Sequence, residues 1–222
     1  MKPRKRGKAL ARLTATAAKA GRTIIAYVLD ESGSMEACRE AVLSGFAEYI
    51  ATLRRTAGTD PAAFFLVKFN TSVFPVHRGV SLAAVPDLTP QTYRPDGNTA
   101  LYDAVMEVIA AADRRLAPED RVLVIVHTDG QENSSRRYGK AEVAAAIRAR
   151  EARGNWTFVY LGADQDAWGE GVGLGMAGAN TSAYQATAAG TRATYRRMAR
   201  STAAWMTSQV RQSDHFWEAD RS

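Results

Sequence analysis

The sequence predicts an α/β fold with a mostly parallel central sheet, and three observations lead to this prediction. Apolar segments of strand length alternate along the chain with segments whose apolar residues recur at helical spacing. Several strand-like segments are apolar on both faces, as in strands that helices cover on both sides. The chain has 222 residues, 46% of them apolar, which is enough for one well-buried core and short for two.

Five segments are predicted to be strands because they are rich in β-branched and aromatic residues and end at turn residues. They cover residues 22–29, 62–69, 73–78, 121–130 and 155–164. A short polar turn joins the second and third segments, which predicts a hairpin. Pro75 places the third segment at an antiparallel edge of the sheet, because proline cannot donate a hydrogen bond to a neighbouring strand. A small strand or a loop is expected near Met176.

Five further segments carry apolar residues at helical spacing and are predicted to be helices. They cover residues 35–55, 99–116, 141–154, 166–174 and 191–210. The domain organisation follows from these elements. We expect a basic, disordered tail over residues 1–21, one domain over residues 22–208 that includes the last helix, and a C-terminal tail over residues 209–222. In that last tail, Phe216 and Trp217 are expected to pack on the body or to bind a partner.

The net charge of +6 belongs to the N-terminal segment and not to the predicted domain. Residues 1–22 contain eight lysine or arginine residues and no acidic residue, so subtracting eight from 29 leaves 21 basic against 23 acidic residues in the rest. A basic tail can bind nucleic acid or an anionic surface. No aromatic residue lies between its charges to stack on bases, so we favour a solvated arm over a nucleic-acid-binding tail.

Three features of the composition favour a cytoplasmic protein. No stretch approaches the roughly 18 uninterrupted apolar residues of a membrane span, and the basic N-terminus lacks the apolar segment of a secretory signal. Cys38 is the only cysteine, which excludes an internal disulfide and suits a reducing compartment. It lies beside an apolar helical stripe, so we expect a packed side chain there and not a reactive thiol.

The stretch YVLDESGSM joins the end of an apolar strand to three oxygen-bearing side chains, those of Asp30, Ser32 and Ser34. Thr99 opens a predicted helix, and Asp129 follows another apolar strand. In open α/β sheets ligands bind outside the carboxyl ends of the strands, so these five side chains could form a single site. Two carboxylates and three hydroxyls, without cysteine or histidine, suit Mg²⁺ or Mn²⁺ and argue against Zn²⁺ and Cu²⁺.

Helix capping is the alternative role for the hydroxyl groups. Ser32, Ser34 or Thr99 could each cap the helix that follows it. Capping does not explain why Asp30 and Asp129 end two apolar strands, so we favour a metal site.

Four neighbouring polar residues, among them Asp96, have weaker claims to this site. Asp103 lies in the first turn of a predicted helix, where a carboxylate suits the helix dipole. Glu132 and Asn133 are candidates for the rim of the site. The histidines are scattered along the sequence and receive no role.

The order of these residues resembles the metal-ion-dependent adhesion site of the von Willebrand factor type A family. That site has the pattern Asp-x-Ser-x-Ser, then a threonine, then an aspartate, and here DESGS, GNTALYDAV and TDG supply these segments in order. The order of the predicted elements fits the family from Arg22 to about Leu174. The resemblance implies a three-layer, Rossmann-like fold with helices on both faces of the sheet.

The resemblance also implies how the site works. Ser32, Ser34 and often Thr99 contact the metal, whereas Asp30 and Asp129 act directly or through water. An Asp or Glu of a protein partner fills an open coordination position, since a first shell of mainly neutral hydroxyls leaves the cation most of its charge. We therefore predict a non-catalytic protein-binding module that depends on Mg²⁺ (or Mn²⁺) and acts as an adaptor in an intracellular assembly.

Enzymatic alternatives lack their expected motifs. A Mg²⁺-dependent phosphotransferase with Asp30 as nucleophile would resemble haloacid-dehalogenase-type enzymes, which need Asp-x-Asp where this sequence has Ser32 in the second position. The stretch ESGSM is not the G-x-S-x-G elbow of a serine hydrolase, and no phosphate-binding loop is present. GEGVGLGMAG has the spacing of a dinucleotide fingerprint but lies late in the chain, outside a first βα turn.

Overall fold

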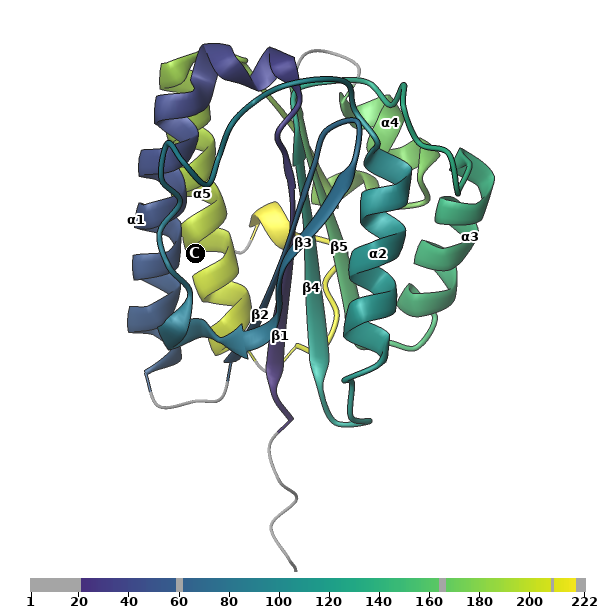
Figure 1. The fold of residues 1–222 in the computed structure, drawn as a ribbon. Helices are drawn as coiled ribbons and strands as arrows, with labels where there is room; N and C mark the ends of the chain where they lie inside the picture. The colour runs from purple at the N-terminus through teal and green to yellow at the C-terminus, as the bar shows by residue number, and fades with distance from the viewer. Residues whose placement is uncertain (1–20, 59–61, 164–166, 209, 219–222) are drawn as a thin grey trace, which may run out of the picture.

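A six-stranded sheet runs through the middle of the molecule in the order β3-β2-β1-β4-β5-β6 (Figure 1). The computed structural model describes residues 21–58, 62–163, 167–208 and 210–218. The strands are β1 (Thr23–Asp30), β2 (Ala62–Phe69), β3 (Val73–Ser81), β4 (Arg121–Thr128), β5 (Trp156–Ala163) and β6 (Thr181–Tyr184). Neighbouring strands pair in parallel, except that β2 and β3 form an antiparallel hairpin. The predicted mostly parallel sheet with one antiparallel edge strand is confirmed.

The position of each strand in the sheet follows from its side chains. β3 alternates between half-buried and exposed residues, and Pro75 withholds one backbone donor, so this strand has a neighbour on one side only. β1 and β4 are buried at nearly every position and lie together in the middle of the sheet.

Helices cover both faces of the sheet and give the molecule three layers (Figure 1). They are α1 (Arg39–Ala57), α2 (Leu101–Asp113), α3 (Lys140–Glu151), α4 (Ala167–Gly173) and α5 (Ala188–Thr207). Short 3₁₀ turns occupy Gly33–Cys38, Leu82–Ala84, Gly178–Asn180 and Phe216–Glu218. α1 and α5 pack against each other on one face, while α2 and α3 lie on the other. The expected three-layer α/β architecture is therefore confirmed.

Strand β1 shows how the core is divided between the two faces. Ile25, Tyr27 and Leu29 belong to the apolar cluster under α1 and α5. Ile24 and Val28 belong to the cluster under α2 and α3. Successive side chains of a strand point to opposite faces, so a strand that is apolar throughout requires a helix layer on each side.

Two elements near the C-terminus differ from the sequence prediction. Met176 lies in a loop, one of the two alternatives expected there, but β6, which begins at Thr181 and pairs with the end of β5, was not predicted. A strand of four residues is too short for its periodicity to identify it. α5 begins earlier than predicted because the Thr187 hydroxyl caps it, accepting a hydrogen bond from the backbone N of Gly190 over 3.1 Å.

The segment after α5 packs onto the body through Asn180. The backbone N of Phe216 donates to Asn180 Oδ1 over 2.8 Å, and Trp217 Nε1 donates to the backbone O of Asn180 over 3.0 Å. Both aromatic side chains are buried. Of the two expected roles for these aromatic residues, packing on the body or binding a partner, the structure shows packing on the body.

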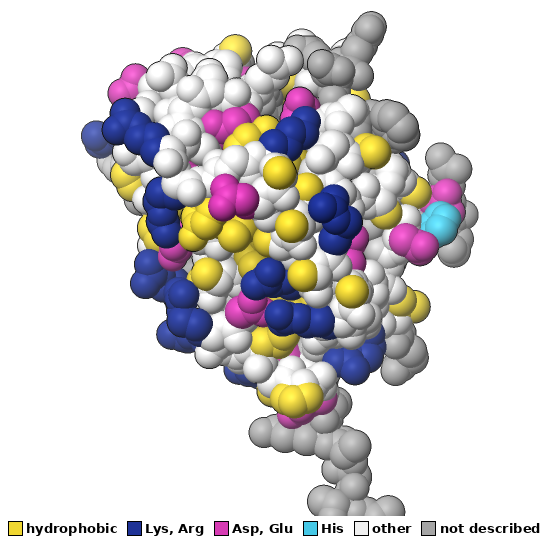
Figure 2. All heavy atoms as spheres, turned by 90° about the vertical axis from the view of Figure 1, so that its right-hand side faces the viewer, with side chains coloured by type: hydrophobic (Ala, Val, Ile, Leu, Met, Phe, Trp, Pro, Cys, Tyr) yellow, Lys and Arg dark blue, Asp and Glu magenta, His cyan; other side chains and the backbone are white. Residues whose placement is uncertain are grey.

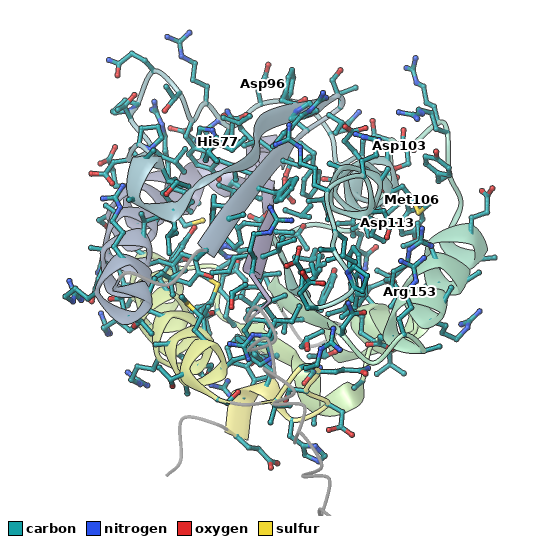
Figure 3. The ribbon with its side chains drawn as sticks, turned by 90° about the horizontal axis from the view of Figure 1, so that it is seen from below. His77, Asp96, Asp103, Met106, Asp113 and Arg153 are labelled. Atoms are coloured by element: carbon teal, nitrogen blue, oxygen red, sulfur yellow. The ribbon has the colours of Figure 1, made fainter. Side chains whose placement is uncertain are left out.

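The face made by α3 and α4 carries basic and acidic side chains next to each other (Figure 2). Lys140 pairs with Glu170 at 3.2 Å. Arg150 pairs with Asp113 at the end of α2 at 2.6 Å. Arg153 pairs with the same carboxylate at 2.7 Å (Figure 3). This face therefore has no single sign of charge. The predicted basic tail lies almost entirely outside the described residues.

Candidate metal centre

The five side chains predicted to bind a cation lie at the carboxyl end of the sheet, the upper end in Figure 1. Asp30 is the last residue of β1, and Asp129 follows directly after β4, its parallel neighbour. Ser32 and Ser34 lie at the start of the 3₁₀ turn that leads into α1. Thr99 lies two residues before α2. Adjacent parallel strands end at the same edge, so segments far apart in the sequence meet here.

Interatomic distances show that these side chains converge. Ser34 Oγ donates to Asp129 Oδ1 over 2.6 Å, and the hydroxyl oxygens of Ser32 and Ser34 lie 3.2 Å apart. A methyl carbon built on Gly130 would lie 3.2 Å from Thr99 Oγ1. It would lie 3.8 Å from Ser34 Oγ and 4.0 Å from Ser32 Oγ. The three predicted hydroxyls therefore gather around Gly130, beside the carboxylate that precedes it.

Asp30 is 0% exposed, and neutral donors hold its carboxylate. The backbone N of Ser32 donates to Oδ1 over 2.7 Å, and the Thr128 hydroxyl donates to Oδ2. No lysine or arginine of the described residues forms an ion pair with it. Burial raises the pKa of Asp30 to about 6, against the hydrogen bonds from Thr128 and Ser32 and with a smaller contribution from the Asp129 charge. A divalent cation here would offset the cost of burying this charge.

Helix capping does not account for the three hydroxyls. The Ser32 side chain makes no capping hydrogen bond to the 3₁₀ turn, and Ser34 lies inside that turn with its hydroxyl directed at Asp129. Ala100, and not Thr99, is the N-cap residue of α2. The capping alternative is therefore wrong for each of these residues.

Residues 92–98, which we call the Thr99 loop, lead to the start of α2. Gly97 has a φ of +72°, and a Cβ there would lie 2.6 Å from Thr71 Oγ1, so glycine is required at this position. The backbone O of Gly97 accepts from the backbone N of Gly33 over 3.0 Å. This contact fixes the Thr99 loop against the segment that carries Ser32 and Ser34.

The turn between β2 and β3 holds the two residues that flank Thr99. The backbone N of Asn98 donates to Thr71 Oγ1 over 2.9 Å, and the backbone N of Ala100 donates to the backbone O of Asn70 over 2.8 Å. Sequence reasoning missed this role because Asn70 and Thr71 carry only the signal of a turn.

Glu132 and Asn133, which the sequence placed at the rim, join the loop after β4 to the start of α2. The backbone N of Thr99 donates to Asn133 Oδ1 over 2.9 Å, and the backbone N of Asn133 donates to the backbone O of Thr99 over 3.1 Å. Tyr102, in the first turn of α2, donates its backbone N to Glu132 Oε2 over 3.0 Å. These bonds set the position of Thr99 relative to Asp129.

Asp103 lies on α2 (Figure 3) and is 7% exposed. Its carboxylate accepts from the backbone N of Arg136, Arg137 and Tyr138, at 3.1 Å in each case. Its own backbone N donates to Ser135 Oγ over 3.1 Å. The carboxylate therefore anchors the segment before α3, a contact more specific than the expected interaction with the helix dipole.

The donor set determines which ion would fit. Hydroxyl and carboxylate oxygens are hard ligands, which Mg²⁺ and Mn²⁺ prefer. Within the described residues, no three His, Cys, Asp or Glu side chains form a cluster that could hold a metal. A cation at this site would therefore depend on the serine and threonine hydroxyls as well as on the two carboxylates.

Comparison with solved structures identifies the fold as that of a von Willebrand factor type A domain. A von Willebrand factor type A protein from Catenulispora acidiphila has a TM-score of 0.56 and 20% identity, over 83% of this chain and 43% of that chain. The PilB minor pilin from Streptococcus sanguinis has a TM-score of 0.61 and 12% identity, over 84% and 62%. The vWF domain of the type V pili tip protein Mfa5 from Porphyromonas gingivalis has a TM-score of 0.55 and 9% identity, over 86% and 98%.

The resemblance inferred from the sequence is thus confirmed at the level of the fold. No family model matches the sequence, and no curated protein is significantly similar to it. This chain spans less than two thirds of the length of the Catenulispora and PilB chains. None of the helices in the described part of the chain has the length and apolarity needed to cross a membrane.

Proposed function

We propose that this chain is a protein-binding module whose binding depends on Mg²⁺ or Mn²⁺. The ligands would be the side chains of Asp30, Ser32, Ser34, Thr99 and Asp129. One observation carries the proposal: three hydroxyls converge beside one carboxylate, next to a second carboxylate that is buried without a positive partner among the described residues.

The residues of the site divide their roles by charge and burial. Ser32, Ser34 and Thr99 present neutral oxygens, which bind a cation without cancelling its charge. The carboxylate of Asp30 accepts a hydrogen bond from the backbone N of Ser32, and that of Asp129 accepts one from the hydroxyl of Ser34. When bound, the cation would supply a Lewis-acidic position that an Asp or Glu side chain of a protein partner can fill.

A non-catalytic role is favoured by the state of His127 and Lys68. His127 lies two residues before Asp129, but burial lowers its pKa to about 3 and its Nδ1 lies 2.9 Å from the Tyr27 hydroxyl. Lys68 is paired with Glu31 at 2.7 Å. Neither group is available to activate water or to receive a proton from a substrate at this site.

The setting of the module is part of the same proposal. We infer an adaptor in an intracellular assembly from the single cysteine, which is buried and suits a reducing compartment. The similar structures include pilus proteins, which favours a binding module over an enzyme.

A pull-down from the native source, with the full chain as bait, tests the function. We expect a protein partner that wild type retains in Mg²⁺ and loses in EDTA, and that Asp129→Ala loses in both. Asp214→Ala is the matched control, because this aspartate is exposed and its neighbour Ser213 contacts Thr157 near the amino end of β5, at the opposite end of the sheet. A partner retained by all variants in EDTA would contradict a metal-dependent interface.

A further inference from the structure

Glu31 lies inside the DESGS segment, yet its side chain points away from solvent and forms a partly buried ion pair. It is 5% exposed, and its two carboxylate oxygens lie 2.8 and 2.7 Å from Lys68 Nζ. Lys68 belongs to β2, the strand beside β1. Because both charges lose hydration in such a place, the pair requires well-aligned hydrogen-bond partners.

The ion pair reaches the Thr99 loop through two hydrogen bonds. Lys68 Nζ donates to the backbone O of Thr92, and the backbone N of Arg94 donates to Glu31 Oε1. Thr92 and Arg94 both belong to the Thr99 loop. The ion pair therefore connects the ends of β1 and β2 to the segment that leads to Thr99.

Backbone contacts extend this connection along the loop. The backbone N of Asp96 donates to the backbone O of Glu31 over 2.9 Å, and the Gly33–Gly97 contact follows it. The DESGS segment and the Thr99 loop thus run side by side. A displacement of the loop would have to break the hydrogen bond between Glu31 and Arg94 as well as these backbone contacts.

Charge balance explains why a glutamate can occupy this position. Lys68 neutralises Glu31, so the pair adds no net charge beside Asp30 and Asp129. A leucine would fill a similar volume but would offer no acceptor to the backbone N of Arg94. The carboxylate therefore contributes a directed contact, where an apolar side chain would contribute packing alone.

We propose that Glu31 is a positioning residue for the metal centre: its carboxylate, held by Lys68, fixes the Thr99 loop and thereby the Thr99 hydroxyl. This inference rests on the proposed function, because it assigns Glu31 a part in the affinity for the cation. Asn133 holds Thr99 from the opposite side, so the test has to isolate the contribution of the Glu31–Arg94 contact.

Two double variants differ in the acceptor that they offer to Arg94; the glutamine also carries an amide NH₂ group, which the leucine lacks. Glu31→Gln/Lys68→Met keeps a side-chain carbonyl oxygen there, whereas Glu31→Leu/Lys68→Met removes it. Both variants remove the two charges together, so neither leaves a buried charge without a partner. We expect the glutamine variant to bind Mn²⁺ within about threefold of wild type and the leucine variant about tenfold more weakly, at the same midpoint of thermal unfolding. Equal Mn²⁺ affinities of the two variants would overturn the proposal.

Hydrogen exchange in EDTA tests the positioning role without any cation. The amides of residues 92–98 should exchange about tenfold faster in the leucine variant than in the glutamine variant. If wild type binds no Mn²⁺, the proposed function fails, but the exchange experiment still tests whether Glu31 positions the Thr99 loop. Faster exchange in the leucine variant supports this role, and equal exchange in the two variants overturns it. If the double variants do not fold, Glu31→Asp gives the same comparison with wild type, because it keeps the charge beside Lys68 and withdraws the acceptor by one methylene.

Discussion

Two buried aspartates at opposite ends of the sheet are stabilised in different ways. Asp120, just before β4 at the amino end, is 1% exposed and pairs with Arg22 over 2.7 Å. It also accepts from the backbone N of Ala117 over 2.9 Å. Asp30, at the carboxyl end of β1, is equally buried but receives only neutral donors from the described residues. The same type of side chain thus has a protein cation at one end of the sheet and none at the other.

The pKa values of the two carboxyls differ accordingly. Burial acts to raise the pKa of Asp120, but hydrogen bonds from Arg22 and from the backbone of Ala117 outweigh it, and the pKa lies below its ordinary value. Burial raises the pKa of Asp30 to about 6. At the amino end of the sheet, this fold balances a buried carboxylate with an arginine of its own. At the carboxyl end, where we propose the metal centre, a bound cation would supply the balancing charge.

Asp103 represents a third arrangement, since within the described part of the chain only backbone amides donate to its buried carboxylate. It lies on α2, near the carboxyl end of the sheet, so nearness to that end does not by itself leave a carboxylate without donors. The difference between Asp30 and Asp103 is therefore the number and direction of the donors around each group. This makes the three aspartates a matched series for mutagenesis.

Removing the charge of Asp120, which Arg22 balances at the amino end of the sheet, should have the largest effect on stability. Asp120→Asn should lower the free energy of unfolding by about 2 kcal/mol, because it breaks the pair with Arg22 and weakens the backbone contacts. Arg22 is half exposed and can stay hydrated, which limits the loss. Urea unfolding measures this difference, and the Mn²⁺ affinity should not change.

The same variant should reveal the pH dependence of the pair. A carboxyl whose pKa is lowered on folding stabilises the protein above its unfolded value of about 3.9, and this stability is lost as the pH falls through the folded value. The difference in unfolding free energy between wild type and Asp120→Asn should therefore shrink below about pH 3.9. A difference that stays constant into the acid range would show that charge plays no part.

A methyl group added among the three hydroxyls should weaken cation binding at the carboxyl end of the sheet and leave the Asp120–Arg22 pair at the amino end unaffected. Gly130→Ala should weaken Mn²⁺ binding about tenfold, because the added carbon lies 3.2 Å from Thr99 Oγ1 and crowds the ligands. The φ of Gly130 is not in the left-handed region, so alanine can adopt the backbone without strain. Calorimetric titration with Mn²⁺ measures the loss of affinity. An unchanged affinity would show that the cation does not bind beside these hydroxyls.

Weakening the amide-held carboxylate should have the smallest effect. Asp103→Asn keeps one acceptor oxygen for the backbone of residues 136–138 and should cost about 1 kcal/mol in urea unfolding. Its Mn²⁺ affinity should stay within about threefold of wild type, because the carboxylate does not face the proposed ligands. A much larger loss of affinity would indicate that the segment before α3 controls the site.

The sequence predicted most of the fold because the features that specify it are local. The apolar runs of β1 and β4 require helices on both sides, and Pro75 requires an edge. Asp30 and Asp129 could be placed together because each ends a strand of the same parallel sheet. β6 was missed since four residues carry no readable period.

The supports of the site could not be predicted, because they depend on contacts between distant segments. Glu31 lies between two proposed ligands in the sequence, and only its pairing with Lys68 reveals that it faces inward. Asn133 was recognised as a neighbour of the site, but its reciprocal bonds with Thr99 join two loops 34 residues apart. Arg22 and Asp120, which form the ion pair at the amino end of the sheet, belong to no sequence motif.

The affinity for Mn²⁺ of Asp30→Asn, measured beside Asp120→Asn, tests the central claim most directly. Wild type and Asp120→Asn should bind one Mn²⁺ with equal affinity, whereas Asp30→Asn should show no measurable binding. In EDTA, Asp30→Asn should unfold at a urea concentration at least as high as wild type, because it removes a buried charge that has no positive partner. Wild-type Mn²⁺ affinity in Asp30→Asn would contradict the proposed metal centre.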